Sequence, residues 1–247
     1  MKIIPTLCLL LLTLPLAAQN EDAKKPDLLP NQQAFLNLPE EKRAEFSNHL
    51  GEAIRVFQQK RIFEALEELE KAAAIFTDSP EIHNVRGSCY VEIRAFDKAL
   101  AEFGKAAALS KDNASIAFNI GEIHFVTKQW QQAHDTFQKV MSLLPAENTA
   151  LGRLVEFKIL LCKKKLGQDA EVAAMAEKYD FMDDSPYYFF AQASLAYEAD
   201  NQVKAEEWLA IAGRIFRDPN ILAPWQDTLV EYGYLKSFYG EEAPEVP

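Results

Sequence analysis

The residues between Pro80 and Pro145 repeat with a period of 34, and this period constrains the fold more than any other feature of the chain. Each copy carries a small residue, an aromatic, a second aromatic after a turn, an alanine, a phenylalanine and a small apolar residue. The first copy is Gly87, Tyr90, Phe96, Ala99, Phe103 and Ala106, and the second is Gly121, His124, Trp130, Ala133, Phe137 and Val140. A fixed period of this length is typical of proteins built from stacked units.

The order of these residues resembles that of the tetratricopeptide repeat (TPR) family. Units in the same register span 46–79, 80–113, 114–147 and 186–219, whereas 148–185 matches poorly because position 167 holds glycine instead of alanine. The resemblance implies an all-α fold, a right-handed α-solenoid of antiparallel helix pairs, with about five TPR-like units over 39–219. The aromatic-rich stretch 220–240 is expected to be a helix that caps the apolar end of the stack, and its aromatic residues leave open a second role as a docking surface.

The N-terminal residues predict export, and the segments at both ends of the chain are expected to lie outside the folded repeats. Residues 1–19 combine Lys2, an apolar run from Ile3 to Leu16 and small residues before Gln19, which is the pattern of a secretory signal peptide. The alternative is an anchor that is never cleaved. Residues 20–38 are expected to be a flexible lead-in and 241–247 a disordered tail. The expected location is the bacterial periplasm, with secretion as the other possibility and no stable membrane insertion after cleavage.

The net charge indicates which classes of partner are favoured, and the spacing of the cysteines indicates whether they can form a disulfide. The net charge of −11 disfavours nucleic acid and anionic membrane surfaces and suits a cationic partner, although solubility alone also explains it. Cys89 and Cys162 lie two repeats apart in the TPR register, which is too far for a disulfide. We therefore expect two free and mostly buried thiols.

No pattern of catalytic residues is visible in the sequence. Motifs for metalloproteases, serine hydrolases, phosphate-binding loops and paired cysteines are absent. His49 and His83 occupy the same repeat position, so adjacent helices could bring them together, but two ligands do not complete a zinc site. Packing between helices is the simpler interpretation, and the chain is expected to be non-enzymatic and to need no cofactor.

The TPR resemblance also implies a binding groove lined by the first helix of each pair. The candidate groove residues are Leu50, Ile54, Phe57, Glu81, Asn84, Ser88, Val91, Glu92, Ser115, Phe118, Glu122, Phe125, Tyr187, Phe190, Ser194 and Tyr197. We expect Phe118, Phe125, Phe190 and Tyr197 to bury apolar side chains of a partner, with the acids setting its charge preference. The alternative is that the chain's own lead-in or neighbouring helices cover several of these rings.

The function that the resemblance implies is a protein- or peptide-binding scaffold or adaptor in the cell envelope. The glutamates among the groove positions exclude the type of TPR clamp that grips carboxyl termini with Lys and Asn. A second hypothesis is a permanent structural subunit of an envelope assembly, such as a secretion, pilus or outer-membrane biogenesis machine.

Overall fold

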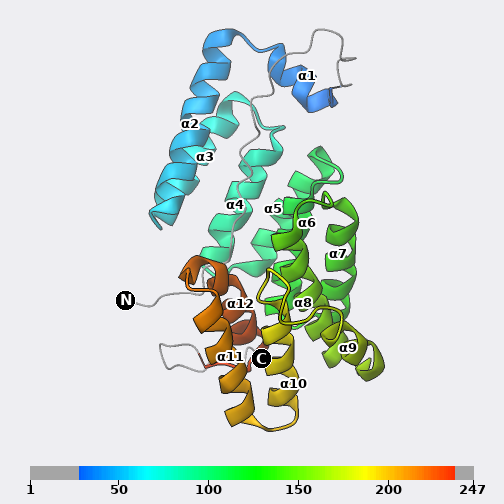
Figure 1. The fold of residues 1–247 in the computed structure, drawn as a ribbon. Helices are drawn as coiled ribbons and strands as arrows, with labels where there is room; N and C mark the ends of the chain where they lie inside the picture. The colour runs from blue at the N-terminus through cyan, green and yellow to red at the C-terminus, as the bar shows by residue number, and fades with distance from the viewer. Residues whose placement is uncertain (1–27, 237–247) are drawn as a thin grey trace. The chain divides into compact units, whose positions relative to one another are not determined.

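A computed structural model describes residues 28–236, and this part of the chain contains twelve α-helices and no strand (Figure 1). The expected signal peptide, the start of the lead-in and the C-terminal tail lie outside the described residues. The chain divides near Ile116 into two compact units. The N-terminal unit is the part described up to Ile116, and the C-terminal unit runs from Ala117 to the last described residue.

The helices of the N-terminal unit follow the repeat. They are α1 (Pro30–Leu36), α2 (Glu40–Gln58), α3 (Ile62–Ile75), α4 (Pro80–Glu92) and α5 (Phe96–Leu109), and α6 (Ala114–Val126) begins at the boundary. Helices α2 and α3 pack as one pair and α4 and α5 as the next. Ser79 caps α4 by accepting a hydrogen bond from the backbone N–H of Ile82, and Pro80 occupies the first position of the helix.

The C-terminal unit contains most of α6 and the remaining helices. They are α7 (Trp130–Leu143), α8 (Thr149–Lys165), α9 (Asp169–Ala176), α10 (Tyr187–Glu198), α11 (Gln202–Ile215) and α12 (Pro219–Tyr232). Helix α9 is only 8 residues long, which explains why the unit at 148–185 loses the strict period. Gly167 follows α8 with a φ of 73°, as expected for a helix that ends on basic residues and a glycine.

A close approach between helices explains the glycine of each repeat. A Cβ atom on Gly87 would lie 2.6 Å from the ring of Phe103, and one on Gly121 would lie 2.7 Å from the ring of Phe137. Any larger residue at these positions would push the paired helix away, so the glycine and the phenylalanine 16 positions later form one packing unit.

The turn inside each pair also repeats with the period of 34. Lys60, Arg94 and Lys128 each adopt a left-handed backbone, with φ of 60°, 58° and 61°. This conformation is unfavourable for residues with a Cβ atom, so each turn carries local strain that a glycine would relieve.

Two segments differ from the sequence-based expectations. The lead-in was expected to be flexible to residue 38, but α1 packs Phe35 against Phe46 and Phe76, with ring centroids 5.1 Å and 5.4 Å apart. The stretch 220–240 was expected to be a helix. Helix α12 begins at Pro219, because Asp218 caps it, and it ends before Gly233, whose φ is 102°; residues 237–240 lie outside the described part of the chain.

Pro224 lies inside α12, although a proline in a helix interior usually breaks or kinks it. The missing N–H of this proline deprives only the carbonyl of Asn220 of its helical partner, and Asn220 is exposed to water. One proline near the start of a helix is therefore tolerated.

Candidate functional site

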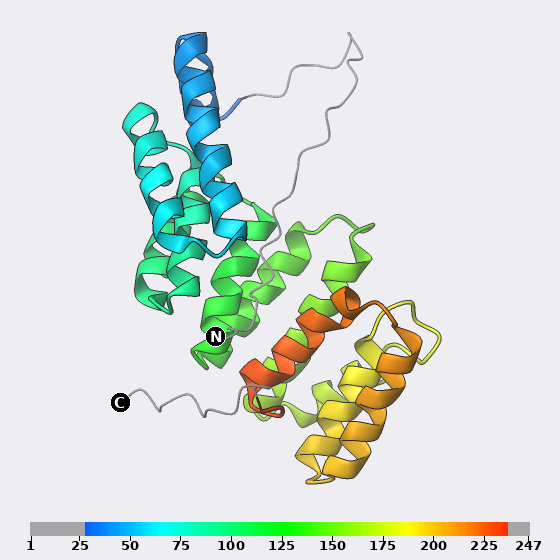
Figure 2. The same ribbon diagram turned by 90° about the vertical axis from the view of Figure 1, so that its left-hand side faces the viewer.

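Helix α12 lies across the first helices of the C-terminal unit instead of capping the end of the stack (Figure 2). Its Trp225 ring packs 5.4 Å from Phe157 of α8 and 5.6 Å from Phe190 of α10. Its Tyr232 ring stacks 6.2 Å from Phe125 of α6. In this unit α12 therefore covers the face that the TPR resemblance assigns to a guest chain.

The predicted groove aromatics of this unit belong to its core. Phe118, Phe125, Tyr187 and Phe190 are exposed by 2%, 0%, 0% and 1%. Tyr197 is partly buried, and its ring stacks 5.0 Å from that of Tyr234, which follows α12. These rings are therefore not open to a partner in this structure, contrary to the first expectation. The chain's own helices cover them, which was the alternative.

A buried cluster of charges joins α12 to the same face. The ammonium nitrogen of Lys158 on α8 lies 2.9 Å from Glu122 of α6 and 3.4 Å from Glu231 of α12. The Lys158 side chain is 2% exposed, and its nitrogen also lies 4.7 Å from the centroid of the Phe125 ring. Glu122, a predicted groove residue, is therefore engaged by the chain itself.

Burial sets the protonation of this cluster. It raises the pKa of Glu122 to about 7 and that of Asp227, also on α12, to about 6, and it raises the pKa of Glu231. Burial alone would lower the pKa of Lys158, but the carboxylates of Glu122 and Glu231 outweigh it and raise that pKa. Lys158 thus stays charged while the acids around it compete for one cation.

Three of the predicted groove residues use their hydroxyl groups in hydrogen bonds to backbone carbonyls of the chain itself. The hydroxyls of Ser88 and Ser194 donate to the backbone carbonyls of Asn84 and Phe190, 2.9 Å and 2.8 Å away. Such bonds back along the same helix satisfy a buried hydroxyl without a ligand. The hydroxyl of Tyr187 donates to the carbonyl of Met175.

The first-helix face of the N-terminal unit is less enclosed at several predicted positions. Leu50, Ile54 and Asn84 are partly buried, and Glu81 is exposed. Other predicted positions lie deeper: Phe57 is 7% exposed, Val91 8% and Glu92 8%, and Glu92 accepts a hydrogen bond from Lys60 at 2.7 Å. Ser115 lies in the first turn of α6 and is partly buried.

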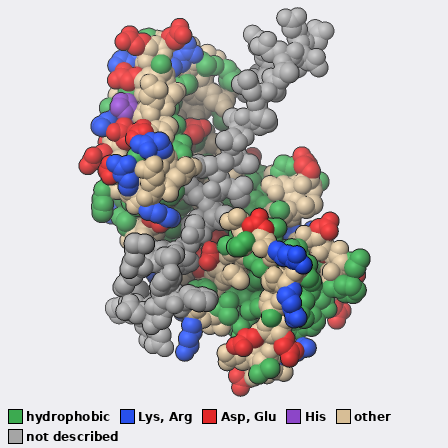
Figure 3. Space-filling model, turned by 60° about the vertical axis from the view of Figure 1, so that its left-hand side comes forward, with side chains coloured by type: hydrophobic (Ala, Val, Ile, Leu, Met, Phe, Trp, Pro, Cys, Tyr) green, Lys and Arg blue, Asp and Glu red, His purple; other side chains and the backbone are tan. Residues whose placement is uncertain are grey.

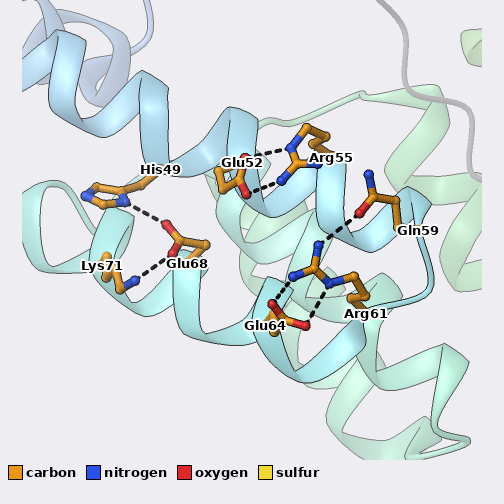
Figure 4. Close-up of polar contacts among 8 residues, drawn as sticks. All are labelled: His49, Glu52, Arg55, Gln59, Arg61, Glu64, Glu68 and Lys71. Atoms are coloured by element: carbon orange, nitrogen blue, oxygen red, sulfur yellow. Dashed lines mark hydrogen bonds and ion pairs between the residues drawn. The ribbon is translucent and has the colours of Figure 1, made fainter.

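The two periodic histidines bind glutamates of the paired helices instead of each other. His49 lies 2.7 Å from Glu68 (Figure 4), and His83 lies 2.7 Å from Glu102. Lys71 also donates to Glu68 and, together with His49, lowers the pKa of that carboxyl. The packing interpretation of these histidines is confirmed. Among the described residues, no group of three His, Cys, Asp or Glu side chains is placed to hold a metal ion.

The surfaces of the two units differ in kind. Figure 3 shows acidic and basic side chains interspersed over the N-terminal unit, and apolar side chains gathered on the C-terminal unit. The exposed large apolar residues of the C-terminal unit include Phe181, Met182 and Val203, at 64%, 74% and 71%. Cys89 and Cys162 are free and buried, as predicted, and burial raises the pKa of each thiol to about 12.

Lys158 and the role of α12 were not predicted from the sequence. Glu156 and Lys158 interrupt the otherwise apolar stretch from Leu154 to Cys162, and a lysine in such a stretch is a signal for a buried ion pair. The aromatic residues of α12 were recognised, but their spacing does not reveal which face they cover.

Comparisons with known proteins agree with this helical-repeat fold. No family model matches the chain. The bovine peptidyl-prolyl cis-trans isomerase FKBP4 is 30% identical over 105 residues, which are 42% of this chain and 21% of that protein. The human FKBP4 is 26% identical over 150 residues, 60% of this chain and 31% of that protein. The chain thus spans about a fifth to a third of these relatives, and their activity is not transferred to it.

Solved structures are similar over a larger share of the chain. PilF of Pseudomonas aeruginosa has a TM-score of 0.55 and 16% identity, over 78% of this chain and 97% of that one. YrrB, described as a TPR protein with an unusual peptide-binding site, has a TM-score of 0.53 and 20% identity, over 78% and 96%. TTC0263 of Thermus thermophilus, another TPR protein, has a TM-score of 0.52 and 16% identity, over 75% and 99%.

Within the part of the chain that the structure describes, no helix combines the length and the apolar character needed to cross a membrane. The repeat register, the helix pairs and the structural likenesses agree on one architecture. The chain is an all-α helical solenoid with the fold of the tetratricopeptide repeat proteins.

Proposed function

We propose that this protein is a non-enzymatic scaffold that binds another protein or a peptide in the cell envelope. The observation that carries the proposal is the fold itself, because stacked helix pairs present long first-helix faces suited to a segment of a second chain. The similarity to YrrB, described as having a peptide-binding site, supports it. The envelope location rests on the N-terminal sequence alone.

The N-terminal unit offers the more accessible part of the proposed groove. Leu50 and Ile54 of α2 are partly buried, so each has surface left for a ligand, and the exposed Glu81 lies in the first turn of α4. Apolar surface beside carboxylates suits a segment that carries both apolar and basic side chains. The net charge of −11 favours the same kind of partner.

Site-specific photocrosslinking tests this proposal. A photoreactive phenylalanine analogue at Ile54 on α2 should capture a defined partner protein in extracts of the producing cells. The matched control is the same analogue at Phe63 on α3, a residue that is 71% exposed. A partner captured at position 54 and not at position 63 supports the groove, and equal capture at both positions, or at neither, contradicts it.

The second hypothesis, a permanent structural subunit, predicts a different complex. In that case the partner would copurify at fixed stoichiometry through high salt. A transient adaptor held partly by charge would lose its partner as salt rises, because exposed charges are screened.

A further inference from the structure

Helix α12 is seated in the C-terminal unit as a guest helix would be. Its buried side chains Trp225, Leu229 and Tyr232 follow the spacing i, i+4 and i+7. This is the spacing by which an amphipathic helix lays one face into a groove. The surface beneath it comes from α6, α8 and α10, through Phe125, Phe157 and Phe190 and the charged pair described above.

The charged groups between α12 and the face beneath it are not balanced. Without α12, Glu122 and Lys158 form a pair with no net charge. Helix α12 adds Glu231, whose side chain is 7% exposed, and the partly buried Asp227. Glu122 and Glu231 therefore share one ammonium group, and Asp227 adds a third negative charge that interacts with theirs. Glu122 Oε1 lies 2.9 Å from the Lys158 ammonium nitrogen, so this cation is already paired before α12 contributes its acids. Buried carboxylates in excess of their cations oppose docking.

We propose that the face formed by α6, α8 and α10 is a binding site for an amphipathic helix of a partner protein, and that α12 occupies it until such a helix displaces it. The partner helix carries an aromatic residue, a leucine and an aromatic residue at the spacing of Trp225, Leu229 and Tyr232. Opposite Lys158 it carries amides or other neutral side chains instead of carboxylates. This inference rests on the proposed scaffold function and names the partner class for one of its faces.

Charge complementarity favours such a partner over a second copy of this chain. The α12 of a second copy would bring the same two carboxylates, Asp227 and Glu231, and would recreate the excess of negative charge. A helix with a neutral polar face leaves the Glu122–Lys158 pair intact and adds no uncompensated charge. It therefore binds the same apolar surface without the electrostatic cost.

Binding of synthetic helices to the full-length chain tests the proposal. The first probe is a fluorescein-labelled peptide of residues 217–236 that carries Asp227→Asn and Glu231→Gln, and the second is the same peptide with its native sequence. The control peptide carries Trp225→Ala and Tyr232→Ala. Fluorescence anisotropy should show that the neutral peptide binds at least 10-fold more tightly than the native peptide, and that the control does not bind.

A variant of the chain tests displacement directly. The full-length Trp225→Ala variant should bind the neutral peptide at least 10-fold more tightly than the wild-type chain, because its own α12 competes less well. If the neutral peptide fails to bind this variant while circular dichroism shows wild-type helicity, the proposal is overturned. Native peptide that binds as tightly as the neutral one also overturns it and assigns the face to a second copy.

Hydrogen exchange on the wild-type chain decides the matter if the variant does not fold. The amides of α12 should exchange by local opening, at least 10-fold faster than those of α8. Equal protection of α12 and α8 would show that α12 never leaves, which overturns the proposal. Photocrosslinking at Ile54 separates this proposal from the scaffold function. If a partner is captured at Ile54 but no peptide binds the face of α6, α8 and α10, only the present proposal is wrong. If both experiments fail, the scaffold function is wrong as well.

Discussion

Replacing Glu122 by glutamine should stabilise the protein at alkaline pH and change its stability little near pH 5. Glu122 is 4% exposed and shares Lys158 with Glu231. Glutamine has nearly the same shape as a protonated glutamate, so the substitution imitates the neutral form of the carboxyl at every pH. The difference between variant and wild type therefore measures the cost of ionising this one group.

The magnitude follows from the pKa. Burial raises the pKa of Glu122 from 4.5 to about 7, and this difference corresponds to about 3 kcal/mol between the two protonation states. The folded protein holds the proton more tightly than the unfolded chain, so this contribution to the free energy of unfolding is complete below pH 4.5 and is lost as the pH rises through 7. The pKa of about 7 already includes the attraction of Lys158 for the carboxylate, so we expect a net gain of up to about 3 kcal/mol for the variant at pH 8.

Urea unfolding followed by circular dichroism at pH 5 and pH 8 measures this effect. The urea concentration at the midpoint of unfolding should be lower at pH 8 than at pH 5 for the wild type. For Glu122→Gln this decrease should be much smaller. The matched control is Glu147→Gln, a change at an exposed glutamate of the same unit, which should leave the wild-type dependence intact. Parallel pH dependences for wild type and Glu122→Gln would refute the reasoning about the cluster.

Three further predictions concern the repeat and the thiols. Gly87→Ala should lower the free energy of unfolding by about 1–3 kcal/mol, because its Cβ would lie 2.6 Å from a phenyl ring, whereas Gly104→Ala, with open space around it, should be neutral or stabilising in the same urea titration. Arg94→Gly should raise the midpoint of thermal unfolding by relieving a φ of 58°, with a net gain of up to about 1 kcal/mol; a lower midpoint would contradict this. Cys89 and Cys162, buried and with pKa values near 12, should react with a thiol reagent only after denaturant is added, and rapid reaction of the native protein would contradict their burial.

The repeat itself was predictable because it depends on local spacing. The period of 34 places Gly87 and Gly121 against the phenylalanines of the paired helices. These features need only neighbouring helices in the expected order. The left-handed turns at Lys60 and Arg94 were not predicted, because neither residue is a glycine and no side-chain pattern marks the conformation.

The exposure of the candidate groove could not be predicted in the same way. Phe125 and Phe190 occupy groove positions in the register, but whether they meet water, a partner or α12 depends on a contact between segments far apart in the sequence. The hydrophobic period identifies α12 as a helix with one apolar face and does not tell which surface that face covers. Lys158 was missed for a related reason, since its partner Glu231 lies 73 residues away.

Nuclear Overhauser contacts between aromatic rings test whether α12 covers the first-helix face of the C-terminal unit. In full-length protein with labelled aromatic residues, Tyr232 should show cross-peaks to Trp130 and Phe125, since the ring centroids are 5.5 Å and 6.2 Å apart. Trp225 should likewise show cross-peaks to Phe157, at 5.4 Å. If these cross-peaks are absent and Tyr232 instead contacts residues of α11, then α12 caps the end of the stack and the first-helix face is open.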